Sequence, residues 1–348
     1  MNTEQLLLEV QDLKLHFFTN EGVVKAVNGA SYTVRRGKTL CIVGESGCGK
    51  SVAARAILQI VHQPGRIVDG KIFYHRPLAS GRTETVDITR LHSRGAAIRM
   101  LRGNEIAMIF QEPMTSLSPL YTVGNQIIEA IRLHNRISKE DARERAVEML
   151  AKVGIPRPEA RIDEYPFRLS GGMRQRCMIA MALSCNPKLL IADEPTTALD
   201  VTTQAQILDL MLQLQAEFGM SILFITHDLG VVAEIADDVA VMYMGMVVER
   251  GDVDTIFNTP KHPYTISLLQ SIPKIGPTRQ RLDPIRGMVP SPFETLNGCP
   301  FHPRCDQMVK GLCDKVVPTT IALSENHEVR CLLYDEANLA KQAEMHHD

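Results

Sequence analysis

The 348-residue sequence lacks any stretch that approaches the ~20 consecutive apolar residues of a membrane-spanning helix. Its N-terminus is acidic and has no long apolar segment, so we expect no secretory signal. The formal net charge is −2, and this lack of a basic excess argues against nucleic acid as the main partner. Hydrophobic residues make up 45% and charged residues 22%, which excludes a disordered chain or a coiled coil. We therefore expect a globular cytoplasmic protein that reaches a membrane only by docking on a partner.

The order of sequence patterns predicts the fold class. Strand-like and helix-like segments alternate, which is typical of an α/β fold with a mostly parallel sheet. Residues 7–18 and 30–34 alternate like strands with one buried face. Helices are expected at 50–61, within 123–184 and at 262–272, and buried strands at 39–44, 188–193, 221–226 and 238–245. Prolines become frequent from about residue 276, so we expect a separate, loop-rich appendage there.

A glycine-rich segment, GESGCGKS, lies between a predicted buried strand and a predicted helix. It fits G-x-x-x-x-G-K-[ST], the phosphate-binding loop, whose glycines let backbone N–H groups turn toward phosphate oxygens. The lysine is expected to reach the β- and γ-phosphates, and the final serine to bind Mg²⁺. The expected ATP-binding residues of this loop are Gly44, Glu45, Ser46, Gly47, Cys48, Gly49, Lys50 and Ser51.

Two acids, Asp193 and Glu194, follow the apolar run at 189–192. Asp193 can hold Mg²⁺ through its water shell, and Glu194 can act as general base on an attacking water. Phosphoryl transfer is mostly positioning and charge stabilisation, so it needs a metal, a base and cationic clamps. Together with the phosphate-binding loop, this acidic pair predicts nucleotide hydrolysis.

A third motif, LSGGM at 169–173, precedes Asp193 by just over twenty residues. It resembles the signature motif of ABC-type ATPases. The resemblance covers about residues 5–335 and is closest to the D-type ATPase subunits of dipeptide/oligopeptide (and nickel) importers. It is also carried by AMIFQEPMTSLSP, IADEPTTALDVTTQAQIL, ITHDLGVVAEIADDVAVMYMG, HPYTISLL and NGCPFHPRC. Met173 stands where the family most often has glutamine, but the backbone amides and Ser170 still supply the phosphate contacts.

The resemblance implies roles for residues outside the loop. Gln111 is the expected Q-loop glutamine, with a part in catalysis and in binding Mg²⁺. Asp200 is the expected D-loop aspartate, and His227 the expected switch histidine. Phe17 is expected to stack on adenine, with Phe18 as the alternative.

The family works as head-to-tail pairs, so the resemblance implies that the signature serves the nucleotide of the partner. A signature at a helix N-terminus is a second anion site, and one phosphate-binding loop cannot use both ends of its own fold. The residues expected to contact the partner's nucleotide are Ser170, Gly171 and Gly172.

The resemblance also implies the architecture and the assembly. We expect an ABC ATPase domain at 1–255, with a RecA-like core, an antiparallel β subdomain and a helical signature subdomain at about 112–184. A C-terminal extension at 256–335 and a tail at 336–348 follow. The expected partners are an F-type ATPase subunit in a heterodimer, two permease subunits and an extracytoplasmic binding protein. Such a complex places the chain at the cytoplasmic face of the inner membrane, as a peripheral protein.

The expected function is ATP hydrolysis that powers import of di- or oligopeptides. Nickel, oligosaccharides and opines remain alternative cargoes, because the ATPase does not touch the cargo. An ABC ATPase acting on nucleic acid, and a regulatory chain with a degenerate site, are the alternatives from other classes. No coiled-coil insertion or tandem ATPase half supports the first, and the intact motif residues argue against the second.

Four of the eight cysteines, Cys299, Cys305, Cys313 and Cys331, crowd into the C-terminal region. In a reducing cytosol such a group indicates metal more than disulfides. Four thiolates suffice for a zinc ion or a [4Fe–4S] cluster, and the spacing is not the Cys-x2-Cys of common zinc ribbons. Some D-type subunits resemble this sequence here and carry an iron–sulfur cluster, so the cluster is the leading expectation. Zinc and unliganded thiols remain alternatives.

Overall fold

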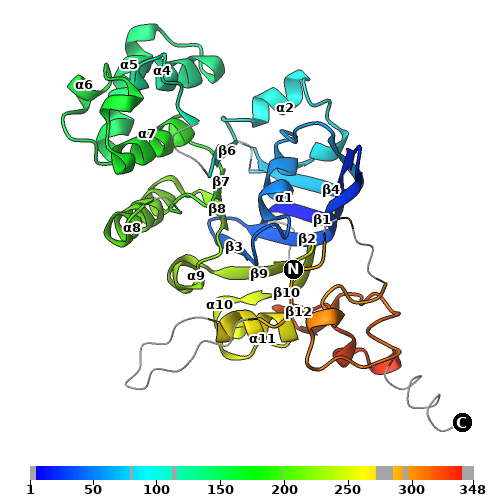
Figure 1. Cartoon of the computed structure of the whole chain (residues 1–348). Helices are drawn as coiled ribbons and strands as arrows, with labels where there is room; N and C mark the ends of the chain where they lie inside the picture. The colour runs from blue at the N-terminus through cyan, green and yellow to red at the C-terminus, as the bar shows by residue number, and fades with distance from the viewer. Residues whose placement is uncertain are drawn as a thin grey trace, which may run out of the picture.

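The structure is a computed structural model that describes residues 5–78, 81–111, 116–197, 199–271, 285–291, 293 and 297–338. Its larger sheet is built from β3 (Thr39–Val43), β6 (Ile106–Ile109), β7 (Leu189–Asp193), β8 (Ser221–Ile225), β9 (Asp238–Tyr243), β10 (Met246–Asp252), β11 (Ile321–Ser324) and β12 (His327–Val329). The strand order is β11-β12-β10-β9-β3-β8-β7-β6 (Figure 1). The neighbours from β9 to β6 are parallel, and β10, β12 and β11 add antiparallel pairs. Every residue of β3, β7 and β8 is buried, as continuous apolar runs in a covered parallel sheet require.

A second, antiparallel sheet contains β1 (Leu6–Thr19), β2 (Gly22–Arg35), β4 (Gly65–Pro77) and β5 (Thr83–Asp87), in the order β2-β1-β4-β5. The two alternating segments expected from the sequence correspond to β1 and to the end of β2. The sequence analysis did not predict β4 and β5. Polar residues interrupt β4, and Gly70 adopts a φ of 91° opposite the bulge at Asp12, so the alternation that would reveal the strand is broken.

The helices expected at 50–61, within 123–184 and at 262–272 form with shorter bounds, whereas those at Ala96–Leu101, Val201–Phe218, Leu229–Ile235 and Val253–Asn258 were not predicted. The helices are α1 (Lys50–Ile57), α2 (Ala96–Leu101), α4 (Val123–His134), α5 (Lys139–Lys152), α6 (Pro158–Arg161), α7 (Gly171–Leu183), α8 (Val201–Phe218), α9 (Leu229–Ile235), α10 (Val253–Asn258) and α11 (Pro263–Gln270), with 3₁₀ turns at Ile88–Arg90, Pro166–Arg168, His302–Arg304 and Leu332–Tyr334. Side chains of Thr122, Ser138, Ser170, Asp200, Asp228 and Asp252 cap the helices that follow them. The helix expected at 50–61 stops early because Gln59 takes a left-handed φ of 50°. Across the described ranges, no helix has both the length and the apolar character needed to cross a membrane.

The C-terminal extension joins the main sheet, so the expectation of a separate appendage is wrong. Strand β12 pairs with β10, and β11 pairs with β12 at the sheet edge. Glu249 of β10 is fully buried and accepts the backbone N–H groups of Lys261 and His262 at 2.6 and 2.9 Å. Its carboxylate also hydrogen-bonds the His327 ring at 2.8 Å. One buried carboxylate therefore joins α11 and β12 to the main sheet.

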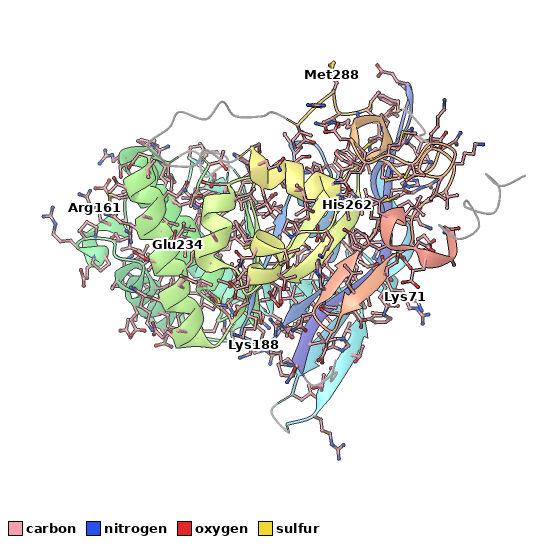
Figure 2. All side chains as sticks on the ribbon, turned by 90° about the horizontal axis from the view of Figure 1, so that it is seen from below. Lys71, Arg161, Lys188, Glu234, His262 and Met288 are labelled. Carbon is pink, nitrogen blue, oxygen red and sulfur yellow. The ribbon has the colours of Figure 1, made fainter. Side chains whose placement is uncertain are left out.

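His262, labelled in Figure 2, is buried at the start of α11. It makes the stability of this junction depend on pH. Its Nδ1 accepts the Tyr264 N–H at 3.0 Å and caps α11, and burial lowers the pKa of His262 to about 3. The unfolded chain takes up a proton below about pH 6.5 and the folded chain does not, so stability falls as pH drops toward about 3. We expect a loss of about 2 kcal/mol between about pH 6.5 and about pH 5 from this residue.

The His262→Asn variant tests this expectation, because asparagine keeps a capping acceptor and does not titrate in this range. Urea unfolding of both proteins across this pH interval should give a shallower dependence of the free energy of unfolding for the variant. Equal dependence in the two proteins would assign the effect to other groups.

Candidate nucleotide site and the extension packed on it

The glycine-rich loop folds as a tight turn between β3 and α1. Gly44, Gly47 and Gly49 adopt φ angles of 150°, 79° and 100°. A Cβ on Gly44 would lie 2.1 Å from the Met242 carbonyl oxygen. A Cβ on Gly49 would lie 2.1 Å from the Ala26 carbonyl oxygen. Side chains are therefore excluded at both positions, and the expected strand–loop–helix context is confirmed.

Lys50 and Ser51, the first two residues of α1, have different hydrogen-bond partners. The Lys50 ammonium donates to the carbonyl oxygens of Gly44 and Glu45 at 2.8 and 3.0 Å, so it folds back along the loop. The Ser51 hydroxyl donates to Asp193 Oδ1 at 2.6 Å. This bond joins the end of β7 to the start of α1, and it places two oxygen ligands side by side.

Asp193, the last residue of β7, has one carboxylate oxygen that makes no hydrogen bond within the described part of the chain. The residue is fully buried, and burial raises the pKa of its carboxyl group. Its Oδ2 lies 3.8 Å from Arg55 Nη2 and accepts no hydrogen bond from any described residue. A buried carboxylate oxygen beside a serine hydroxyl has the ligand chemistry that Mg²⁺ prefers. These residues therefore fit a magnesium ion.

Three polar side chains lie against the Glu194 carboxylate, and two of them, Gln111 and His227, were predicted to take part in hydrolysis. Its Oε2 accepts Gln111 Nε2 at 3.0 Å and the Thr197 hydroxyl at 3.2 Å, and its Oε1 lies 3.4 Å from His227 Nδ1. Glu194 takes a left-handed φ of 47°, held by its N–H bond to the Ile225 carbonyl at 3.0 Å. Non-glycine residues in this conformation are strained and concentrate at functional sites. Thr197 is a member of this group that the sequence analysis missed.

The signature residues lie away from this group. Ser170 caps α7 through its hydroxyl, and Gly171 has open space around its Cα. In Figure 1, α7 lies with α4, α5 and α6, on the far side of the main sheet from α1. A Cβ on Gly172 would lie 3.1 Å from Thr203 Cγ2, and Thr203 donates its hydroxyl to Asp200 at 2.7 Å. The signature and Asp200 are therefore neighbours within one chain.

Asp200 serves as the N-cap of α8. Its carboxylate accepts the backbone N–H and the hydroxyl of Thr203, and these bonds lower the pKa of Asp200. The expected D-loop motif is Ala198-Leu199-Asp200; of its residues Ala198 lies outside the described part of the chain, as do residues 112–115 beside Gln111.

The two phenylalanines of β1 face different surroundings. Phe17 is half-buried, and a Cβ on Gly65 would lie only 2.6 Å from its ring. Phe18 is exposed, and the Arg66 guanidinium lies 4.2 Å from its ring centroid. Both rings are near the β1–β2 turn, so the adenine-stacking role of Phe17 stays a prediction.

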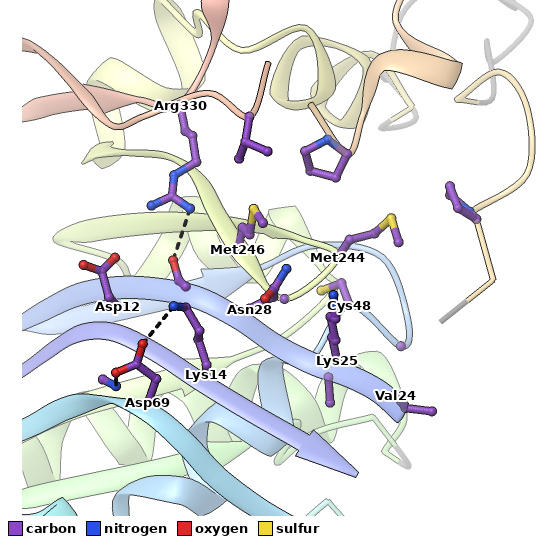
Figure 3. Close-up of a pocket in the computed structure, with 18 of the residues that line it drawn as sticks. Asp12, Lys14, Val24, Lys25, Asn28, Cys48, Asp69, Met244, Met246 and Arg330 are labelled. Carbon is purple, nitrogen blue, oxygen red and sulfur yellow. Dashed lines mark hydrogen bonds and ion pairs between the residues drawn. The ribbon is translucent and has the colours of Figure 1, made fainter. Parts of the chain in front are cut away.

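A cavity of about 1090 Å³ separates the antiparallel sheet from the C-terminal extension (Figure 3). Ser46, Gly47 and Cys48 of the phosphate-binding loop form part of its lining. Arg330 lies elsewhere on the lining, where it donates to the Gly29 carbonyl at 3.2 Å, and the Lys14–Asp69 pair closes the sheet side. Lys50, Asp193 and Glu194 are not among the lining residues. The cavity therefore borders the phosphate-binding loop but not the two carboxylates.

The four C-terminal cysteines gather in one part of the extension. Cys299 donates its N–H to the Cys313 carbonyl at 2.8 Å. Burial, reinforced by the neighbouring thiols, raises the pKa of Cys299 to about 11 and that of Cys331 to about 12. Cys305 is one of these neighbours for both residues, because its thiolate would repel theirs. Yet the part of the chain that is described contains no group of three or more His, Cys, Asp or Glu side chains arranged to hold a metal ion. The expected cluster site is thus not formed as a coordination sphere.

An ion pair that the sequence analysis did not predict links the extension to the phosphate-binding loop. Arg304 Nη1 lies 2.6 Å from Glu45 Oε2, and Nη2 lies 3.1 Å from Oε1. The Tyr264 hydroxyl accepts the Glu45 backbone N–H at 2.9 Å. The partners are 259 and 219 positions apart in the sequence, so no local pattern could have revealed them.

Known proteins share this combination of a nucleotide loop and an extension. A profile described as ABC transporter matches residues 27–197. The oligopeptide transport ATP-binding protein AppD of Bacillus subtilis is 50% identical over 331 residues, which cover 95% of this chain and 97% of AppD. The chain belongs to the ABC transporter family. A second profile, the C-terminal region of oligopeptide/dipeptide transporters, matches residues 248–313 of this ABC transporter protein.

Other relatives agree with this placement of the ABC protein. The dipeptide transport ATP-binding protein DppD of Escherichia coli is 46% identical over 325 residues, which cover 93% of this chain and 96% of DppD. A dimeric post-hydrolysis structure of the ATP-binding cassette MJ0796 with ADP and Pi has a TM-score of 0.60 and 25% identity, and it covers 71% of this chain and 99% of that one. The expected α/β fold of an ABC cassette is therefore confirmed. ATP and Mg²⁺ are the ligands to expect of an ABC ATPase.

Proposed function

We propose that this ABC ATPase powers a binding-protein-dependent importer of di- or oligopeptides. The observation that carries the proposal is the Glu194 carboxylate, held by Gln111, Thr197 and His227 beside the Ser51–Asp193 pair. The names of relatives such as AppD and DppD, with the extension that they share with this chain, support peptides as the cargo.

Each residue of the site is assigned a role on chemical grounds. Lys50 and the loop amides bind the β- and γ-phosphates. Ser51, Asp193 and Gln111 would hold Mg²⁺, which supplies charge neutralisation on the phosphate oxygens. Glu194 accepts the proton of the attacking water, and its fixed carboxylate needs no reorientation to do so.

His227 and Asp200 complete the site in different ways. His227 lies on the Glu194 carboxylate, and more than half of its side chain is exposed, so it can also reach a γ-phosphate. Asp200 holds the start of α8 beside the signature and would transmit changes between the two. Adenine is assigned to stack on Phe17, with Phe18 as the alternative.

The exposed signature supports a head-to-tail pair. Ser170 and Gly171 are exposed at the N-terminus of a 13-residue helix, and a helix N-terminus is suited to bind an anion. We assign Ser170, Gly171 and Gly172 to the nucleotide of a related F-type ATPase subunit. Two permeases and an extracytoplasmic binding protein complete the complex, which places this chain on the cytoplasmic face of the inner membrane.

The proposed division of the chain follows from these roles. The ATPase domain spans 1–255, with the signature subdomain at about 112–184. The extension spans 256–335 and precedes a tail at 336–348, most of which lies outside the described residues. Because β12 and Glu249 join the extension to the core, we treat the two as one cooperative unit.

A [4Fe–4S] cluster on Cys299, Cys305, Cys313 and Cys331 remains part of the proposal. Four buried or half-buried thiols within electrostatic reach of one another support it. The lack of a formed coordination group among the described residues counts against it, and zinc or free thiols are the alternatives.

The decisive experiment measures ATP hydrolysis of the complex reconstituted with its F-type partner, permeases and binding protein. Di- and oligopeptides are expected to stimulate hydrolysis several-fold, and nickel, oligosaccharides and opines are not. Stimulation by one of these other cargoes alone would replace the substrate and keep the ATPase. Anaerobic purification of the same complex, followed by iron, sulfide and zinc analysis, tests the cluster: a folded, iron-free protein would remove it.

A further inference from the structure

The extension holds the phosphate-binding loop at one residue, Glu45. Arg304 binds both oxygens of the Glu45 carboxylate, and the Tyr264 hydroxyl accepts the Glu45 N–H. The Glu45 carbonyl oxygen accepts the Lys50 ammonium at 3.0 Å. Side chain, N–H and carbonyl of the second loop residue are therefore all fixed, two of the three by residues beyond the matched ABC transporter region.

Arg304 is itself rigidly placed. Its side chain is only 3% exposed. Its Nε donates to the Arg286 carbonyl at 2.9 Å, and its guanidinium carbon lies 5.8 and 5.9 Å from the ring centroids of Tyr243 and Phe301. Two parallel N–H···O bonds to one carboxylate are among the strongest and most directional polar contacts in proteins. An arginine held on every side can fix the group that it binds.

The Arg304–Glu45 ion pair also reduces the negative charge that Glu45 brings to the loop. Glu45 places a carboxylate beside backbone groups that are suited to bind a triphosphate, and two anions at one site repel each other. Arg304 neutralises that carboxylate from the side of the extension. Removal of the arginine would leave a negative charge in the loop and release its first turn at the same time.

We propose that Arg304 is a positioning residue for ATP binding, which acts through Glu45 to hold the phosphate-binding loop and to offset its negative charge. The C-terminal extension is then a structural part of the nucleotide site. This inference rests on the proposed role of residues 44–51 in binding ATP. Arg304 directly precedes Cys305 in the sequence, so the ion pair also connects the cysteine-containing segment to the loop.

The test measures the dissociation constant of a fluorescent ATP analogue on the full-length chain. Arg304→Met roughly keeps the length of the side chain but removes its charge and its two parallel N–H donors. We expect the dissociation constant to rise by at least about tenfold. Arg304→Lys keeps the charge without the two parallel donors, so an intermediate loss is expected. Glu45→Gln added to Arg304→Met removes the unpaired carboxylate but does not restore the two bonds, so it should recover only the part of the affinity that is lost to charge repulsion.

The matched control is Arg143→Met. Arg143 makes the same two-bond contact with Asp163, at 2.8 and 2.7 Å, in the helical subdomain. Both partners are exposed, and we expect nucleotide affinity within about twofold of the wild type. Urea unfolding of each variant separates a loss of affinity from a loss of folded protein. If Arg304→Met does not fold, Arg304→Lys alone and with Glu45→Gln carries the comparison.

Two results would overturn the inference. Binding by Arg304→Met within twofold of the wild type would show that the pair does not position the loop. Failure of Glu45→Gln to restore any affinity to the Arg304 variant would show that the arginine does not offset the negative charge of Glu45 for ATP binding. Loss of binding in Lys50→Met together with unchanged binding in Arg304→Met would refute this inference alone. A wild-type chain that does not bind the analogue would refute the proposed ATP site as well.

Discussion

Replacement of Glu194 by glutamine is expected to lower ATP turnover of the reconstituted complex by about 10²–10⁴-fold, the usual contribution of a general base. Glutamine keeps the size of the side chain and can still bond Gln111 and Thr197, but it cannot accept the proton of the attacking water. ATP binding should change little, because the carboxylate acts in the chemical step. The variant should therefore hold ATP without hydrolysing it.

Single-turnover hydrolysis and nucleotide retention measured on one preparation separate these effects. The control is Glu217→Gln, which removes an exposed carboxylate that pairs with Lys152 on the surface. We expect the turnover of this control to stay near that of the wild type. Normal turnover in the Glu194 variant would exclude Glu194 as the base and shift attention to His227, which lies 3.4 Å from it.

Replacement of Lys50 by methionine is expected to weaken ATP binding by about 100-fold or more. The ammonium of Lys50 is the buried cation of the loop, at 5% exposure, and charge-assisted hydrogen bonds to phosphate are worth about 1.5–3 kcal/mol each. A tenfold loss in affinity corresponds to about 1.4 kcal/mol, so the loss of two such bonds accounts for the effect. Methionine fills the same space without the charge.

Titration with the fluorescent ATP analogue measures this loss directly. Lys38→Met is the matched control, because Lys38 forms an exposed pair with Asp237 at 2.8 Å on a different part of the sheet. Its affinity for ATP should match that of the wild type. Because the Lys50 ammonium also holds the carbonyls of Gly44 and Glu45, unfolding curves must accompany the titration. Undiminished affinity in a folded Lys50 variant would contradict the assignment of this loop to ATP.

Local order in the sequence predicted the chemical parts of this protein. The phosphate-binding loop lies directly between the strand that ends at Val43 and the helix that begins at Lys50, and the backbone angles of its glycines follow from that turn. The acidic pair lies at the end of β7 because an apolar run of that length, buried on both faces, can only be a central strand. Such features depend on residues that are neighbours in the chain.

The residues that the sequence analysis left separate meet only through long-range packing. Parallel pairing of β7 with β8 and β6 brings the ends of these strands to one edge, and there Gln111 and His227 converge on Glu194. The left-handed φ of Glu194 depends on a bond to the neighbouring strand and has no sequence signal.

The position of the extension was likewise a matter of tertiary structure. Proline-rich composition suggested a detached segment, but three backbone pairs between β12 and β10 and the buried carboxylate of Glu249 hold it on the core. The sequence by itself determined which chemistry the chain carries, since motifs are local. Only the tertiary structure decided that Arg304 contacts Glu45. These residues are 259 positions apart, and they meet because the extension packs against the core.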